Sequence, residues 1–191
     1  MNKNALITGS SRGIGKATAL EFASRGYNVV INYVANSAAA EELKKTIEST
    51  YGVRAEIIQA DLSKESDVRE LAKKALELFG KIDVLVNNAG MALYGDFESK
   101  TIAGWEKSMQ INLYAPFLLT QLLAPVMAEN KYGKIVNISS IDVMTTYNAE
   151  SAEYDVSKAA LINLTKTTSL QFQPYVNVNC ICPGWVAVGL Q

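Results

Sequence analysis

Tyr154 and Lys158 are the first residues whose types and spacing suggest proton chemistry. They lie four residues apart in the stretch SAEYDVSKAAL, in a chain of 191 residues that contains no histidine. If this stretch is helical, the two side chains share one face. A nearby ammonium lowers a tyrosine pKa from its usual value of about 10, which suits a general acid or base. The alternative is an ordinary pair on a helix surface.

Two serines and an asparagine are further candidates. Ser139 and Ser140 come at the end of the apolar run KIVNISS (134–140), and Ser140 lies fourteen residues before Tyr154. Ligands bind at the carboxyl ends of strands in parallel sheets, although two serines also simply terminate a strand. Asn112 interrupts an apolar stretch, and Pro116 has no N–H to offer its carbonyl. A kinked helix with a satisfied core amide is the alternative there, and it is compatible with a functional role.

Short runs rich in Val and Ile alternate with longer amphipathic or apolar stretches. The runs predict strands at 5–8, 28–32, 54–60, 82–87, 134–139 and 176–182. The longer stretches predict helices at 15–26, 37–50, 63–80, 103–129 and 152–172. Expected helix ends include Gly26 and Gly80 as C-terminal caps, Ser37 as an N-cap and Ser63 as an opening residue. The alternation predicts an α/β fold with a doubly wound parallel sheet in three layers, in one domain spanning 1–191.

A glycine-rich loop lies between the first expected strand and the first expected helix. In ALITGSSRGIGKA the strand ends at Thr8, and Gly9, Gly13 and Gly15 follow. Glycines allow a tight turn and close approach of a ligand, and the helix amino terminus offers free N–H groups to a pyrophosphate. Glycines also serve ordinary turns, but this position favours a phosphate-binding loop.

The loop TGSSRGIG resembles the cofactor loop of the short-chain dehydrogenase/reductase family. Three further stretches match that family in the expected order along the chain: NNAG (87–90), YDVSK (154–158) and PGWV (183–186). The resemblance implies a Rossmann-type fold, a nicotinamide cofactor, and interconversion of a ketone and a secondary alcohol as small-molecule substrates. The general likeness is to 3-oxoacyl-acyl carrier protein reductases and to sugar, polyol and steroid dehydrogenases. The segment SLQFQPYVNVN lacks the arginines frequent in carrier-protein reductases, which disfavours that substrate.

The resemblance also implies catalytic roles for four residues. Tyr154 would exchange the proton, and Ser140, a better match in spacing than Ser139, would hold the substrate oxygen. Lys158 would lower the tyrosine pKa and contact the nicotinamide ribose. Asn112 would hold a water that links to this lysine. The stretch VMTTYNAESAEY (143–154) is expected to line the substrate side.

The cofactor is expected to be NADP rather than NAD. Asn32 stands where NAD-binding members often carry an acid, and Arg12 lies inside the glycine loop, where it favours a 2′-phosphate. Asn36 and Ser37 are candidates to hydrogen-bond that phosphate. Arg12 as a surface residue and Asp61 as a turn residue remain alternatives. The resemblance implies cofactor contacts from Gly9, Ser11, Arg12, Gly13, Ile14, Gly15, Asn36, Asp61, Leu62, Asn88, Ala89, Gly90, Tyr154, Lys158, Pro183, Gly184 and Val186.

Composition excludes several other classes of protein. Hydrophobic residues make up 49% and charged residues 19%, with a net charge of −1, so we expect a soluble protein without a nucleic-acid or membrane surface. The chain enters a strand pattern at once, which leaves no room for a signal peptide. Cys180 and Cys182 are expected to be small buried thiols in a reducing compartment, so the protein should be cytoplasmic. Without histidine, a transition-metal site is not expected.

Two expectations concern the whole assembly. The stretches 103–129 and 152–172 are apolar beyond one face, and in the family such helices pair subunits, so we expect a homo-oligomer, a dimer or tetramer. Family members usually continue past the PG motif with a lid and a final strand, so the chain is expected to lack the end of the family fold. It also departs from the family near Ala187 and Val188, where a threonine is common. The rival function is a non-catalytic nucleotide sensor or scaffold on the same fold.

Overall fold

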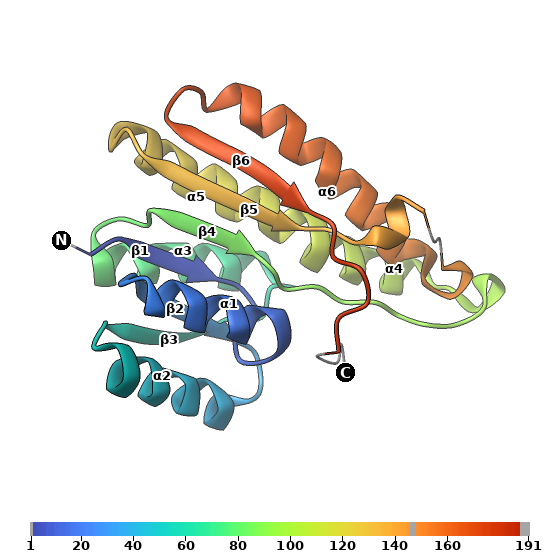
Figure 1. The fold of residues 1–191 in the computed structure, drawn as a ribbon. Coiled ribbons are helices and arrows are strands. Elements are labelled where there is room, and N and C mark those ends of the chain that lie inside the picture. Colours follow the sequence, from blue (N-terminus) through green and yellow to red (C-terminus); the bar gives the residue numbers. More distant parts are fainter. Residues whose placement is uncertain (1, 146–147, 188–191) are drawn as a thin grey trace.

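A single parallel sheet contains every strand of the described part of the chain, as the prediction required. The computed structural model describes residues 2–145 and 148–187. Six strands lie in the order β3-β2-β1-β4-β5-β6 (Figure 1). They are β1 (Asn4–Ile7), β2 (Asn28–Tyr33), β3 (Ala55–Gln59), β4 (Val84–Asn87), β5 (Gly133–Ile138) and β6 (Val176–Ile181). The order reverses between β1 and β4, and in such sheets the crevice beyond this switch point binds ligands.

Helices cover the sheet from both sides, and the strands alternate between the two resulting cores. The helices are α1 (Gly13–Ser24), α2 (Ser37–Tyr51), α3 (Glu65–Phe79), α4 (Ile102–Met109), α5 (Ala115–Glu129) and α6 (Ala152–Gln171). Ala5 and Ile7 of β1 pack with α1 and α2, whereas Leu6 faces the core built with α3 and α5. Figure 1 shows α1 and α2 on one face of the sheet and α3, α5 and α6 on the other.

The three-layer arrangement is incomplete over β5 and β6. Their side chains alternate between buried positions toward α5 and α6 and more exposed positions on the opposite face. On that face β1 to β3 have α1 and α2, while no helix of the described residues lies over β5 and β6 (Figure 1). The predicted doubly wound sheet with helices on both faces is confirmed, and among the described residues the layer of α1 and α2 does not extend over β5 and β6.

Several predicted helix ends move by one or two residues because different groups satisfy the terminal N–H and C=O groups. Asn36, not Ser37, caps α2, since its Oδ1 accepts a hydrogen bond from the Ala39 N–H at 3.0 Å. The first helix ends at Ser24, and Gly26 follows in the left-handed region with φ of 81°. The third helix begins at Glu65 rather than Ser63. Gly80 caps it with φ of 73°, as expected.

The predicted helix over 103–129 is interrupted at Asn112. A π-helical turn, η2 (Gln110–Tyr114), separates α4 from α5. It ends two residues before Pro116, which lies in the first turn of α5. A proline removes the N–H that would continue the ordinary ladder, so a locally wider turn is a physical solution to the sequence.

Three short 3₁₀ turns complete the connections among the described residues. The turns are η1 (Phe97–Ser99), η3 (Ile141–Val143) and η4 (Ala149–Ser151).

Among the described residues, one helical stretch, Ile102–Glu129, is long and apolar enough to cross a membrane, but half of its apolar window is buried as in a core helix. The same residues contain no cluster of three or more potential His, Cys, Asp or Glu metal ligands. Cys180 and Cys182 are free and only partly buried, contrary to the expectation of buried thiols, because β6 lies at the sheet edge.

Candidate active site

Tyr154 and Lys158 lie on one face of α6, next to the carboxyl end of β5. Both side chains are buried, with 9% and 2% of their surface exposed. The Lys158 Nζ is 5.6 Å from the centroid of the Tyr154 ring. It donates a hydrogen bond of 2.7 Å to the Ile138 carbonyl at the end of β5. The spacing in the sequence therefore does produce neighbouring side chains, and both have been removed from bulk water.

The two serines at the end of β5 have different surroundings. The Ser139 hydroxyl donates to the Lys158 carbonyl at 2.9 Å, so it fastens β5 to α6. The Ser140 hydroxyl accepts from the Asp142 N–H at 3.2 Å and also hydrogen-bonds Tyr154. Ser140 therefore neighbours Tyr154, whereas the Ser139 hydroxyl is engaged with α6, and the catalytic choice of Ser140 stays a prediction.

Burial dominates the titration of both groups on α6. Desolvation lowers the Lys158 pKa to about 8. Desolvation likewise raises the Tyr154 pKa above its usual value, against the opposing effect of the Ser140 hydrogen bond, and the charge of Asp142 raises it further. In this structure the Tyr154 pKa is therefore raised overall, opposite to the direction that the Lys158 ammonium alone would give, and the role of Lys158 stays a prediction. Loss of water disfavours the charged forms of both groups, the phenolate and the ammonium.

Asn112 is fully buried within the π turn and holds the loop that follows β4. Its Oδ1 accepts from the Met91 N–H at 2.8 Å, and its Nδ2 donates to the Met91 carbonyl at 2.8 Å. The same amide nitrogen reaches the Ser157 hydroxyl on α6 at 2.9 Å. A methyl group added at Gly90 would lie 3.2 Å from the Lys158 Nζ and 3.5 Å from the Asn112 Oδ1. Asn112, Gly90 and Lys158 thus converge, while the asparagine side chain itself is committed to the Met91 backbone.

A cleft of about 760 Å³ runs from the glycine loop to these residues. Of the residues expected to contact a cofactor, those lining it are Gly9, Ser11, Arg12, Gly13, Ile14, Asn36, Asp61, Leu62, Asn88, Ala89, Gly90, Tyr154, Lys158, Pro183, Gly184 and Val186. Ser140 lines it too, and Asn112 lies behind its wall. One cleft therefore brings together motifs that are far apart in the sequence.

Gly15 is the one expected contact residue that does not line the cleft. A side chain there would lie 2.5 Å from the Gly9 carbonyl oxygen and 2.6 Å from the Asn88 Nδ2. The glycine thus lets α1 pack closely on the loop. Gly9 and Gly13 have φ values of 61° and 55°, so the loop backbone itself also requires glycine at these positions.

The glycine loop fits a dinucleotide phosphate. Arg12 occupies the N-cap of α1 without a side-chain cap, and the first turn contains no acid. The amino end of α1, with its N–H groups and positive dipole end, thus faces the cleft without a protein carboxylate. Asn32 is held by the fold, since its Oδ1 accepts from the Gly9 N–H at 3.1 Å and its Nδ2 donates to the Ala60 carbonyl at 3.2 Å.

Asp61 is held in a turn and also lines the cleft, so it fits both roles considered for it, a turn residue and a cofactor contact. Its Oδ1 accepts from the Ser63 hydroxyl at 2.7 Å and from the Ser63 N–H at 3.0 Å, which makes it a turn residue. These hydrogen bonds are also the main cause that lowers its pKa. The residue still lines the cleft beside Leu62.

Among the cleft residues that sequence reasoning missed are Tyr94, Ile111, Asp142 and Trp185. Tyr94 lies in a loop, Ile111 in the π turn and Asp142 in the 3₁₀ turn η3, where no periodic pattern marks a face. Trp185 lies inside the PGWV motif, whose other three residues were predicted to contact the cofactor, so its place in the motif could have indicated it. In the structure its ring is exposed. Of the stretch 143–154, Tyr154 lines the cleft, while Thr146 and Tyr147 lie outside the described residues, as does Val188.

The fold and the cleft together define a Rossmann-type α/β protein with a dinucleotide-binding crevice at the strand carboxyl ends. The family model for short chain dehydrogenases matches residues 3–191, so the chain belongs to the short-chain dehydrogenase/reductase family of oxidoreductases.

Relatives and solved structures agree with this membership. A 3-oxoacyl-[acyl-carrier-protein] reductase of Staphylococcus epidermidis is 37% identical over 97% of this chain and 76% of its own length. An acetoin dehydrogenase structure from Salmonella typhimurium superposes with a TM-score of 0.94 at 32% identity, over 100% of this chain and 76% of the other. A short-chain dehydrogenase from Sphingobium yanoikuyae, in complex with NADPH, gives 0.89 at 30% identity, over 97% and 72% of the two chains. The chain thus spans about three quarters of these relatives.

Proposed function

We propose that the protein is an NADP-dependent oxidoreductase that interconverts a small ketone and a secondary alcohol, with Tyr154 as the proton-transferring group. The observation that carries the proposal is a buried tyrosine beside Ser140 and Lys158 in a cleft that continues to the glycine loop. Its raised pKa keeps Tyr154 protonated at neutral pH, so it is ready to donate to a carbonyl oxygen that gains charge.

The nicotinamide cofactor, when bound, supplies or accepts the hydride. In the reductive direction Tyr154 gives its phenolic proton to the substrate oxygen, and the Ser140 hydroxyl holds that oxygen in place. Lys158 provides positive charge next to the phenolate that remains. Asn112 secures the loop at Gly90 through Met91 and belongs, in this proposal, to the relay that returns a proton to Lys158. Oxidation of an alcohol runs through the same groups in reverse.

NADP rather than NAD is supported by charge at the adenosine end of the cleft. Arg12 and Asn36 line it, and Asn32 is neutral and engaged with backbone groups. An acid that would bind a ribose 2′-hydroxyl is missing at Asn32, and a guanidinium suits a 2′-phosphate. Structural neighbours crystallised with NADPH support the same choice.

The substrate class rests on the charge near the reacting centre. Asp142 lines the cleft and its charge acts on Tyr154, which disfavours anionic groups close to the carbonyl. A small neutral ketone or hydroxyketone fits best, and the acetoin dehydrogenases among the structural neighbours act in that class by name. A 3-oxoacyl reductase activity is the competing assignment, supported by the names of several relatives. We further propose a cytoplasmic homo-oligomer.

A spectrophotometric assay tests the function against the rival of a non-catalytic nucleotide sensor. NADPH oxidation is followed over a panel of diketones, hydroxyketones and 3-oxoacyl thioesters, and NADH replaces NADPH in a parallel series. We expect turnover with NADPH and a lower KM for NADPH than for NADH. Arg12→Ala should narrow this difference, whereas Arg25→Ala, at the far end of α1 and paired with Glu21, should leave it unchanged. NADPH binding without any turnover would favour the sensor.

A further inference from the structure

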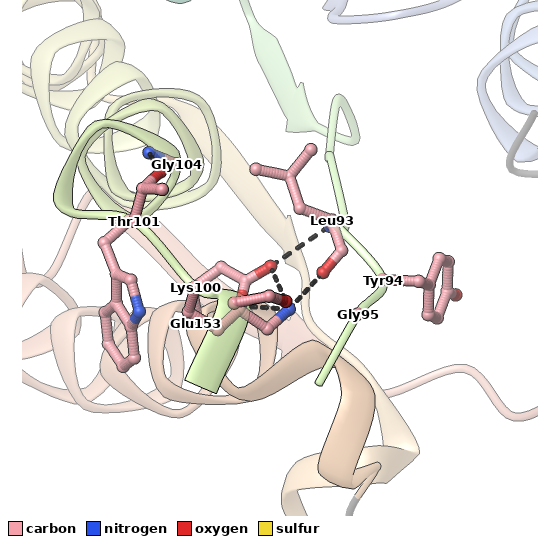
Figure 2. A pocket seen from close by; sticks show the side chains of 9 residues that line it. Leu93, Tyr94, Gly95, Lys100, Thr101, Gly104 and Glu153 are labelled. Carbon is pink, nitrogen blue, oxygen red and sulfur yellow. Dashed lines mark hydrogen bonds and ion pairs between the residues drawn. The ribbon is translucent and has the colours of Figure 1, made fainter. Parts of the chain in front are cut away.

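A buried ion pair lies next to the catalytic cleft, outside the residues assigned so far. Lys100 follows η1, and Glu153 lies in the first turn of α6, directly before Tyr154. The Lys100 Nζ is 3.0 Å from the Glu153 Oε2 and donates to Oε1 at 3.2 Å. Only 10% and 1% of the two side chains are exposed. Figure 2 shows the two charges meeting below the loop that contains Leu93.

The pair joins three segments of the chain. The Lys100 ammonium also donates to the carbonyls of Leu93 and, at 2.6 Å, of Glu150. The Glu153 Oε1 accepts in addition from the Leu93 N–H at 3.2 Å (Figure 2). Gly95 adds a backbone hydrogen bond of 3.0 Å to the Glu150 carbonyl. The loop after β4 is therefore fastened to η4 and to the start of α6 through both charged groups.

Tyr94 lies between these attachment points and faces the other way. In Figure 2 its ring points away from Lys100 and Glu153, and it lines the catalytic cleft with Tyr154. Before Tyr94 the loop is held by Asn112, which binds both backbone groups of Met91, and by Glu153, which binds Leu93. After Tyr94 it is held by the Gly95 N–H, which donates to the Glu150 carbonyl. Attachments on both sides thus fix the segment on which Tyr94 enters the cleft.

Stability alone is a poor explanation for this pair. Removing two charges from water is costly, and apolar residues of similar volume usually serve a protein core at least as well. A cavity of about 110 Å³ lies beside the pair, so the region is not tightly filled. The ion pair binds the Leu93 N–H and the carbonyls of Leu93 and Glu150. These groups lie in the segments that set the distance between Tyr94 and Tyr154. Breaking the pair leaves the loop room to shift.

We propose that Lys100 and Glu153 are positioning residues that hold Tyr94 against the substrate side of the cleft. The proposal rests on the proposed function, in which Tyr154 transfers the proton. The pair does not touch the cofactor region, so its loss should act on the substrate KM. The kcat at saturating substrate and the NADPH affinity should both stay close to the wild-type values.

The first experiment compares Lys100→Met, Glu153→Gln and Tyr94→Ala with the wild type. Each charge variant should raise the substrate KM by about ten-fold, with NADPH affinity unchanged and kcat within about two-fold. Tyr94→Ala should have the same effect, and Lys100→Met with Tyr94→Ala should be no worse than Tyr94→Ala alone, because coupled residues are not additive. Lys73→Met, which breaks an exposed pair with Glu77, is the matched control and should behave as wild type.

A second variant separates positioning from stability. The double replacement Lys100→Met with Glu153→Leu removes both charges together, so it should regain the melting temperature that Lys100→Met loses. Its substrate KM should stay high, because the Leu93 attachments are still missing. Wild-type KM in this variant, or equal losses in kcat and NADPH affinity, would overturn the proposal.

Hydrogen exchange provides a readout that does not depend on turnover. Amides of the peptide containing Leu93 and Gly95 should exchange faster in Glu153→Gln and Lys100→Met than in wild type or Lys73→Met. Unchanged exchange in this peptide refutes the positioning role whatever the activity. A wild-type protein that turns over no ketone or alcohol refutes the proposed function instead, and the exchange result still decides whether the pair holds the loop.

Discussion

At the scale of single residues, burial raises the pKa of Tyr154 and so favours the protonated phenol at neutral pH. The pair of Tyr154 and Lys158 could be predicted from spacing because residues four apart share a helix face. The direction of the Tyr154 pKa shift could not be predicted from the sequence, because it depends on how much water the folded chain excludes from the phenol. A protonated tyrosine at neutral pH suits ketone reduction, while alcohol oxidation needs the phenolate and should accelerate as pH rises.

Replacing Tyr154 by phenylalanine tests this role directly. We expect Tyr154→Phe to reduce kcat by at least about 10²-fold, since a positioned proton donor typically contributes that much. NADPH affinity should stay near wild type, as measured by calorimetric titration. Tyr175→Phe, an exposed tyrosine next to β6, is the matched control. Undiminished kcat in Tyr154→Phe would show that another group transfers the proton.

Lys158 gives a prediction about stability and pH. Its pKa is about 8 in the fold and about 10.4 in an unfolded chain, so between these values the unfolded state binds more protons. The cost of burying the ammonium is therefore full below pH 8 and is relieved as pH rises toward 10.4. We expect Lys158→Met to lose turnover and to melt at a higher temperature than wild type at pH 7. The difference in melting temperature between Lys158→Met and wild type should become smaller by pH 10. A difference that does not depend on pH would contradict the lowered pKa of a buried Lys158 ammonium.

At the scale of elements, the loop between β1 and α1 depends on one close contact. Gly15→Ala would place a methyl group 2.5 Å from the Gly9 carbonyl oxygen, a backbone atom that cannot move aside cheaply. We expect this change to destabilise the fold by about 1–3 kcal/mol in denaturant titration and to weaken NADPH binding. Gly104→Ala is the matched control, since there the nearest atom, the end of the Leu93 side chain, is 3.1 Å away. Equal stability of both variants would contradict the packing role.

Most strands and helices could be predicted from the hydrophobic periodicity of the sequence. The π turn that interrupts the helical stretch 103–129 could not. All six strands and the helices starting at Ser37 and Ala152 follow the sequence patterns closely. The π turn at Asn112 was indicated only by Pro116, because whether a proline kinks, ends or widens a helix depends on its tertiary partners. Tyr94, in a loop, and Asp142, in the 3₁₀ turn η3, were missed because such short segments carry no periodic signal and their approach to Tyr154 is a property of the folded chain.

At the scale of the whole molecule, two surfaces are left without a covering layer among the described residues. One is the face of β5 and β6 opposite α5 and α6, which is half polar: it carries Lys134, Asn177 and Asn179 beside Val136, Ile138 and Ile181. The other lies on α5, α6 and the π turn, where Tyr114, Phe117 and Val156 are each nearly half exposed. Large apolar side chains grouped on neighbouring helices are typical of a protein interface. The second surface therefore supports the expected pairing of subunits through these helices.

A two-fold interface on these helices would bring the same patch from each subunit together. We predict that light scattering at micromolar concentration reports about two or four times the 20.8 kDa mass of the chain. Phe117→Glu and Val156→Glu place a charge in the patch, where burial without a partner is costly, so each should shift the mass toward the monomer. Leu78→Glu, on an exposed position of α3, is the matched control and should leave the assembly intact. A monomeric wild type, or an assembly indifferent to both patch variants, would show that these helices do not pair subunits.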